Sequence, residues 1–269
     1  MRGLSRSSLA EVEERFNAVA ASADFARLAD DLTAVADLLD REHGLRRNMS
    51  DPARPAAQKT QIARALLEGK VSEAALETVA AAVEAKWSRP RDLADALERF
   101  SVVASAAQAE ADGRLDDVED ELFRFGRIVA ANPDLRRTLS DPAAPAEGKR
   151  QLLASLLEGK VTPSSLRLIT QLAVHPRGRS LERGLEEYST LVAAQRQRLV
   201  AVVRSAVVLS DEQKQRLGAW LRTSYGRDVH LNVEVDPRVL GGFSVRIGDE
   251  VIDTTIAGRI EEVRRRLAG

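Results

Sequence analysis

The 269-residue chain lacks cysteine, and the other features in which it is poor exclude further classes of protein. Without cysteine there can be no disulfide, thiolate zinc site, iron–sulfur cluster or cysteine nucleophile. Aromatic residues make up only 4% of the chain, so a hydrophobic core must consist mainly of Leu, Val, Ile and Ala. No apolar run approaches the roughly 18 residues that predict a membrane-spanning helix, and the first ten residues lack the long apolar stretch of a signal peptide.

Neither sign of charge is in excess. The 40 Lys and Arg residues balance 41 Asp and Glu residues, which leaves a formal net charge of −1 and no bulk attraction to nucleic acid or anionic lipid. Charged residues form 30% and apolar residues 44% of the chain, the balance of a folded globular protein. At about 150 residues per domain, the length predicts about two domains.

The first two thirds of the chain have the pattern of amphipathic helices. Residues 1–197 are rich in Ala, Leu, Glu and Arg, which favour the α-helix. Apolar residues recur at steps of three and four, which places them on one helix face. Two such stripes are Leu28, Leu32, Val35, Leu39 and Leu181, Leu185, Tyr188, Val192. The Ser-Asp-Pro segments at 50–52 and 140–142 predict loops that open helices.

This helical part is internally repeated. Residues 45–71 align without gaps with residues 135–161, and 17 of the 27 positions are identical. Upstream, Glu-Arg-Phe occurs at 14–16 and again at 98–100, and the second copy has about six extra residues between this motif and the aligned segment. A unit of about 90 residues is large enough to close its own helical bundle, so the repeat predicts two tandem bundles.

The last third changes to a strand-like pattern. Residues 199–206 and 229–235 predict strands, and 243–247 with 250–253 predict a tight hairpin. A Ser with Gln three residues later, at 210–213, predicts a helix start between the first two strands. Apolar residues from 256 to 267 predict a final helix. The fold class is therefore mainly α, with two tandem helical bundles followed by a small C-terminal α/β domain.

No catalytic or cofactor site emerges from the residues. Lys70 and Lys160 follow glycines but lack the rest of a phosphate-binding loop, and they fit the C-terminal end of a helix instead. The three histidines, His43, His175 and His230, are far apart and have no metal-ligand spacing. These observations predict that the chain is not an enzyme and binds no metal or cofactor.

Residues 235–260 carry ordered motifs that resemble the C-terminal signature of the F-type ATP synthase delta subunit family, whose mitochondrial counterpart is the oligomycin-sensitivity-conferring protein. Upstream, residues 203–210 resemble the family's second-domain entry, and residues 175–181 resemble its Asn-x-Arg-x-x-Leu region but lack the asparagine. The signature motifs are Val-Asp-Pro, Leu-Gly-Gly, Gly-Asp and Val-Ile-Asp. The matching residues, to which we assign structural roles, are Asp236, Pro237, Gly241, Gly242, Gly248, Asp249 and Asp253.

The resemblance covers residues 98–269 and implies a division into three domains. Residues 1–97 are an added copy of the family's N-terminal helical domain, residues 98–197 are that domain itself, and residues 198–269 are the α/β domain. The chain is thus identified as a long bacterial member of the family with a duplicated helical domain.

The resemblance also implies a function. Family members are non-catalytic stator subunits of the proton-transporting ATP synthase. They bind N-terminal helices of the alpha subunits at the top of the catalytic head, and they bind the b and b′ subunits of the peripheral stalk. They lie at the cytoplasmic face of the bacterial cell membrane, held peripherally in the complex. A helical-repeat adaptor unrelated to ATP synthase is the alternative, although it leaves the ordered C-terminal motifs unexplained.

Overall fold

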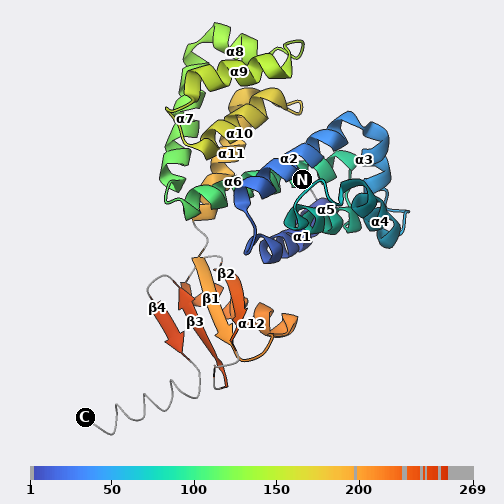
Figure 1. Ribbon diagram of the computed structural model, residues 1–269, viewed down its shortest axis with the longest axis vertical. Helices are drawn as coiled ribbons and strands as arrows, with labels where there is room; N and C mark the ends of the chain where they lie inside the picture. Colours follow the sequence, from blue (N-terminus) through green and yellow to red (C-terminus); the bar gives the residue numbers. More distant parts are fainter. Residues whose placement is uncertain are drawn as a thin grey trace, which may run out of the picture. The chain divides into compact units, whose positions relative to one another are not determined.

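The computed structural model describes residues 3–196, 199–225, 229–236, 239, 241–247 and 250–253. The chain divides into two compact units, Met1–Gln195 (unit 1) and Arg196–Gly269 (unit 2). In its described residues unit 1 contains helices and loops, whereas unit 2 contains a small sheet and a helix (Figure 1). The predicted class, mainly α with a small C-terminal α/β part, is confirmed.

Unit 1 is built from eleven described helices. They are α1 (Leu4–Ala20), α2 (Phe25–Arg41), α3 (His43–Ser50), α4 (Ala56–Leu67), α5 (Glu73–Glu84), α6 (Pro90–Ala111), α7 (Leu115–Ala131), α8 (Pro133–Ser140), α9 (Ala146–Leu157), α10 (Pro163–Val174) and α11 (Leu181–Arg196). Helices α2 to α5 have 17, 8, 12 and 12 residues, and α7 to α10 have the same four lengths in the same order. The sequence repeat is therefore a structural repeat.

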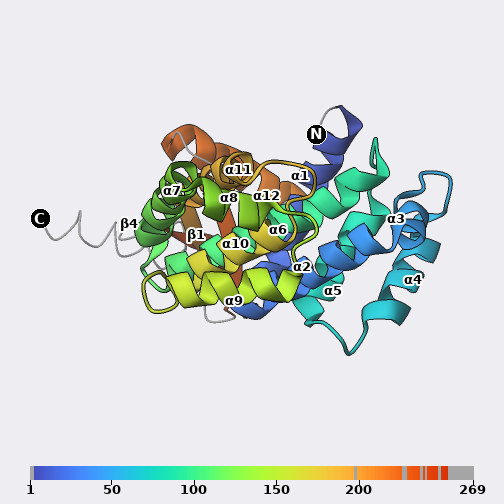
Figure 2. The same cartoon turned by 90° about the horizontal axis from the view of Figure 1, so that it is seen from above.

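Helix α6 belongs to both repeats. Its residues Leu93, Leu97 and Phe100 lie in one hydrophobic core with α1 to α5, whereas Val102 and Ala106 lie in a second core with α7 to α11. We therefore call α1–α6 copy 1 and α6–α11 copy 2. Figures 1 and 2 show α6 between the other helices of the two copies.

The expected boundary at residues 97 and 98 falls inside this continuous helix. The six extra residues of the second copy arise in α6, which continues eleven residues past Phe100, whereas α1 ends four residues after Phe16. The loop that follows is one residue shorter in copy 2. The middle of α6, residues 100–106, is buried on all sides. A helix that is buried all round must be covered from more than one direction, and here copy 1 and copy 2 both cover it.

Both predicted apolar stripes are buried. Every member of the two stripes is at most 4% exposed. The glycines before Lys70 and Lys160 end α4 and α9 with positive φ angles, +71° at Gly69 and +73° at Gly159, as predicted for helix C-termini. Lys160 Nζ also donates to the carbonyl of Leu156 at 2.9 Å.

The Ser-Asp-Pro segments are loops, but the predicted helix opening is wrong. The serines end α3 and α8, and the Asp side chains accept backbone N–H groups two residues later, at 2.9 Å for Ala53 and 2.8 Å for Ala143. Helices α4 and α9 begin later, after Pro55 and Pro145. An Asp side chain bonded two residues ahead forms a local turn, and this turn replaces the expected helix cap.

Unit 2 contains a four-stranded sheet in the order β2-β1-β3-β4. Its elements are β1 (Leu199–Ser205), α12 (Asp211–Tyr225), β2 (Val229–Val235), β3 (Phe243–Ile247) and β4 (Glu250–Asp253). Strands β1 and β2 are parallel, while β1–β3 and β3–β4 are antiparallel. The predicted helix start is confirmed, because the Ser210 N–H donates to Gln213 Oε1 at 2.8 Å and the Gln213 N–H donates to Ser210 Oγ at 3.2 Å. The predicted helix at 256–267 lies outside the described residues.

Candidate binding surfaces

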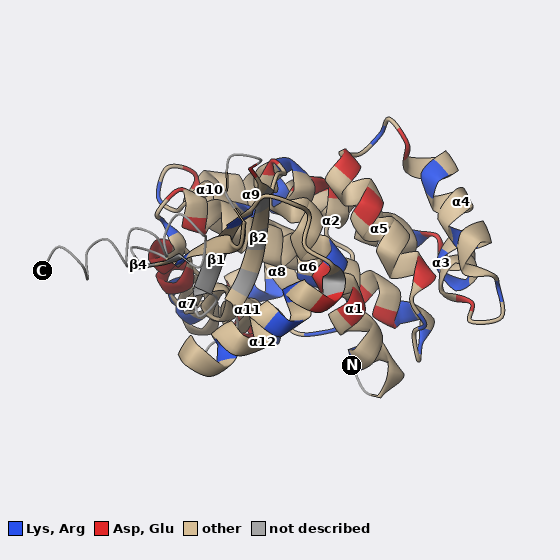
Figure 3. Ribbon diagram, turned by 90° about the horizontal axis from the view of Figure 1, so that it is seen from below, with Lys and Arg blue, Asp and Glu red and all other residues tan. Residues whose placement is uncertain are grey.

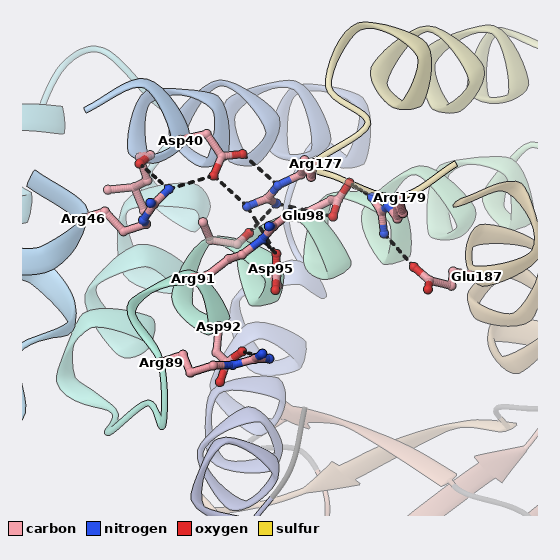
Figure 4. A network of polar contacts seen from close by, with 12 residues as sticks. Asp40, Arg46, Arg89, Arg91, Asp92, Asp95, Glu98, Arg177, Arg179 and Glu187 are labelled. Carbon is pink, nitrogen blue, oxygen red and sulfur yellow. Dashed lines mark hydrogen bonds and ion pairs between the residues drawn. The ribbon is translucent and has the colours of Figure 1, made fainter. Parts of the chain in front are cut away.

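Arg177 is the centre of a polar network that joins the two copies (Figure 4). It lies in the loop between α10 and α11 with a φ of +54°, and its side chain is only 4% exposed. Its Nε lies 2.7 Å from Oδ2 of Asp40 on α2. Its Nη1 donates to the Ala94 carbonyl of α6 at 2.9 Å and lies 3.3 Å from Oε2 of Glu98. One arginine of copy 2 thus contacts both α2 of copy 1 and the shared helix α6.

Glu98 extends this network along α6. Its carboxylate, 6% exposed, contacts Arg179 and accepts a hydrogen bond from the hydroxyl of Tyr188 at 2.7 Å. Burial raises the pKa of Tyr188 well above its usual value, and the neighbouring Glu98 carboxylate raises it further, so the hydroxyl remains a donor. Arg179 also pairs with Glu187 at 2.7 Å. Burial alone would raise the pKa of Glu187, but hydrogen bonds from Arg179 and Arg183 outweigh it and hold that pKa below its usual value.

Two further polar contacts connect α2 with α10 and with His175, the residue after α10. Asp30 Oδ1 lies 2.6 Å from Arg167 Nε, and Asp37 Oδ2 lies 2.8 Å from His175 Nε2. Between the two helices lies a groove of about 450 Å³ whose apolar wall includes Leu166. Together with the Arg177 network, these contacts join copy 1 and copy 2 at several separate points. The network therefore holds copy 1 and copy 2 in one arrangement.

The described residues hold no constellation for chemistry. Among them, no group of three or more His, Cys, Asp or Glu side chains could bind a metal ion. The helices in the same part of the chain also include none that is long and apolar enough to cross a membrane. Figure 3 shows basic and acidic residues interspersed along the helices of unit 1. The arginines of the network are occupied by carboxylates of the same chain.

The structure brings four of the seven signature residues to one end of the sheet. The Asp236 N–H donates to the Ser205 carbonyl at 2.9 Å and fastens the end of β2 to the end of β1. Gly241 and Gly242, with φ angles of +65° and +75°, directly precede β3, and Asp253 ends β4 opposite Ser244. The glycines are needed because other residues are strained at positive φ. Pro237, Gly248 and Asp249 lie outside the described residues.

An exposed apolar surface at this end of the sheet escaped the sequence analysis. Val207 and Val208 follow β1 and are 68% and 74% exposed, and Val235, at the end of β2, is 48% exposed. Val235 lies opposite Ser205 in the parallel pair, so the three valines belong to the same sheet end. Val235 alternates with polar residues in β2 just as Val229, Leu231 and Val233 do, but only those three pack against the core of unit 2. Large exposed apolar residues that gather at one place are typical of protein–protein contacts.

These features define a class of protein. The fold is a helical repeat joined to a small α/β unit, its buried charges hold its own parts together, and its exposed apolar residues suit contacts with other chains.

Comparisons with known proteins identify the family. Residues 103–267 match the family model described as ATP synthase delta (OSCP) subunit. Proteins named ATP synthase subunit delta from Thermobifida fusca, Streptomyces griseus and Kineococcus radiotolerans are 52%, 51% and 46% identical to this chain and cover 100%, 100% and 99% of it. The same matches cover 98% or more of each of these relatives. The chain belongs to the ATP synthase delta (OSCP) subunit family, as a structural rather than a catalytic subunit.

Among solved structures, one chain of the Toxoplasma gondii mitochondrial ATP synthase hexamer matches 62% of this chain and 97% of its own length. The identity is 16% and the TM-score 0.29, which is too low to add to the argument. The family assignment rests on the sequence comparisons, and the full-length matches show that relatives of the same length exist.

Proposed function

We propose that this stator subunit of the ATP synthase links the catalytic head to the peripheral stalk, with N-terminal helices of the alpha subunits on its helical unit and the b and b′ subunits on unit 2. The family match across residues 103–267 carries the proposal. In this role the subunit lies at the cytoplasmic face of the cell membrane and is held there by the complex. A rotary motor needs a stator that resists torque, and two separate contacts on one chain gain from effective concentration.

The network around Arg177 supports the mechanical part of the proposal. A linker that carries load must not bend at its joints, and the junction of the copies is held by a shared helix and by ion pairs from several directions. The exposed valines at 207, 208 and 235 support the stalk contact, since an apolar surface of this kind suits the apolar side of a helix.

Binding of two peptides to the full chain tests the proposal. One peptide copies the N-terminal helix of the alpha subunit, and the other copies the C-terminal segment of the b subunit. We expect saturable binding of both. Val207→Asp with Val208→Asp should abolish binding of the b peptide alone, whereas Gln215→Asp with Ser224→Asp, on exposed positions of α12, should leave it unchanged. Failure of both peptides to bind would contradict the proposal.

We further propose that the helical copies fold as overlapping domains and that unit 2 is a separate domain. A chain that starts at Pro90 keeps all of α6, whereas a chain that starts at Glu98 lacks its first two turns. We expect the longer fragment to unfold cooperatively. The shorter one should be less stable, because it loses the Ala94 carbonyl and the Asp95 carboxylate that contact Arg177. Urea titrations followed by circular dichroism compare them, and equal stability would contradict the overlap.

A further inference from the structure

The two copies carry the same Arg-x-Arg-x-Leu segment before or at the start of their last helix. In copy 2 it contains Arg177 and Arg179, and in copy 1 it contains Arg89 and Arg91. The Arg177 side chain is 4% exposed because α2 of copy 1 lies over it, whereas the Arg89 side chain is 69% exposed. Figure 4 shows Arg89 beside Asp92, apart from the cluster around Arg177. The first arginine of this segment is therefore covered by another helix in copy 2 and exposed in copy 1.

The segment that fills the loop in copy 2 is the acidic C-terminal end of a helix. Asp37 and Asp40 lie in the last turns of α2, where the negative end of the helix dipole disfavours carboxylates. Asp37 Oδ2 lies 2.8 Å from His175 Nε2, and the carboxylate of Asp40 is compensated by Arg177 at 2.7 Å. A basic partner stabilises carboxylates at a helix C-terminus more than carboxylates elsewhere on a helix. The contact is therefore selective for this kind of helix end.

The exposed loop of copy 1 is also basic, with the buried Trp87 where copy 2 has His175 and with Arg89 paired to Asp92 at 2.9 Å. Lys86, Ser88 and Arg89 are exposed, and the Ser88 N–H donates to Ser5 Oγ at 2.8 Å, which ties the loop to the start of α1. Leu4 precedes Ser5 and is also exposed, so an apolar residue lies beside the basic ones. The surface of Leu4, Lys86, Ser88 and Arg89 combines positive charge with an apolar contact.

We propose that this surface, here called the copy 1 loop surface, binds the acidic C-terminal end of an α-helix from a different protein chain. A second molecule of the same chain does not supply this helix. Its α2 is already packed inside its own unit, and α7, the counterpart of α2, has Arg127 and Ala130 where α2 has Asp37 and Asp40. The proposal goes beyond the stator role and does not depend on which subunit provides the helix.

The test uses the full chain and a fluorescent peptide of residues 24–42. Gln replaces the apolar residues Leu28, Leu32, Val35 and Leu39 to keep the peptide soluble. A staple on the same side keeps it helical. Fluorescence anisotropy should show saturable binding that weakens as salt is added, because the contact joins opposite charges. Lys86→Glu with Arg89→Glu should weaken binding about tenfold, the effect of losing two exposed ion pairs and gaining repulsion. Arg136→Glu with Arg137→Glu, at exposed positions of α8, is the matched control and should change nothing.

A peptide with Asp37→Asn and Asp40→Asn should bind as weakly as the acidic peptide binds the Lys86/Arg89 variant. Absence of binding overturns the proposal, and so does binding that the Lys86/Arg89 variant leaves unchanged. Equal weakening by the α8 control also overturns it, because the attraction would then be general to basic residues.

Discussion

Copy 1 and copy 2 have matching helices but different surroundings. Helices α2 and α7 both have 17 residues and bury the same stripe, yet α2 also buries Ala29 and Ala36, where α7 has the half-buried Glu119 and Gly126. The difference arises because α2 packs extensively along the central helix α6, whereas α7 contacts α6 much less. Local sequence therefore determines which segments are helical, and position in the chain determines which of their faces are covered.

The largest expected effect comes from a charge placed in either core. Leu97 on α6 and Leu185 on α11 occupy matching positions, and both are at most 3% exposed. Leu97→Asp and Leu185→Asp should each lower the free energy of unfolding by at least about 4 kcal/mol, through lost burial and a desolvated carboxylate. Leu97→Asp should also disrupt copy 2, because α6 is shared, whereas Leu185→Asp should leave the core of copy 1 intact. Hydrogen exchange resolved by segment distinguishes the two variants, and an unchanged melting temperature for Leu185→Asp would refute its burial.

The next prediction compares the two arginines. Arg177→Ala removes one buried partner from Asp40 and Glu98, which keep Arg46 and Arg179, and should cost about 3 kcal/mol, the low end for a broken buried pair. Arg89→Ala removes an exposed ion pair with Asp92 and should cost at most about 1 kcal/mol. Urea unfolding measures both. Similar costs would mean that the junction of the copies contributes nothing to stability.

A smaller and equal effect is expected at the two helix-ending glycines. Gly69 and Gly159 have nearly the same positive φ, and a Cβ at either would meet no atom within 4 Å. Gly69→Ala and Gly159→Ala should therefore each cost about 1 kcal/mol from backbone strain alone. Thermal unfolding of the two variants checks the equality, and a clear difference would show that these ends of the copies are not equivalent.

The smallest effect is a change in pH dependence. Lys59 and Lys149 are buried, and their Nζ atoms lie 3.5 Å from the Ala85 carbonyl and 3.2 Å from the Ala173 carbonyl. Burial lowers the pKa of both amino groups below 10.5. The folded chain therefore releases these protons before the unfolded chain does, and the free energy of unfolding should rise with pH between the lowered pKa and 10.5.

In Lys59→Met and Lys149→Met, the free energy of unfolding should rise less with pH than in the parent chain, because one titrating amino group is absent. Unfolding free energies measured at several alkaline pH values compare them with the parent chain. Parallel profiles for parent and variants would contradict the pKa shifts, whereas a change in only one variant would show that the two buried lysines differ.

Much of this architecture could be predicted from residue order. The stripe from Leu28 to Leu39 is buried as expected, and the helix start at Ser210–Gln213 forms both of its predicted hydrogen bonds. The candidate interfaces were less predictable. Arg177 lies in a region whose family resemblance was noted, but nothing in the local pattern distinguishes it from Arg89. The exposed Val235 also follows strand alternation as well as any buried residue.

The sequence by itself determined the helices, the repeat, the strands and the family, because these depend on periodicity and on motifs within short segments. Only the tertiary structure decided that α6 serves two cores and that the Arg177 side chain is buried while that of its counterpart Arg89 is exposed. Those outcomes depend on contacts between segments that are distant in the sequence, and the residues next to a position do not determine such contacts.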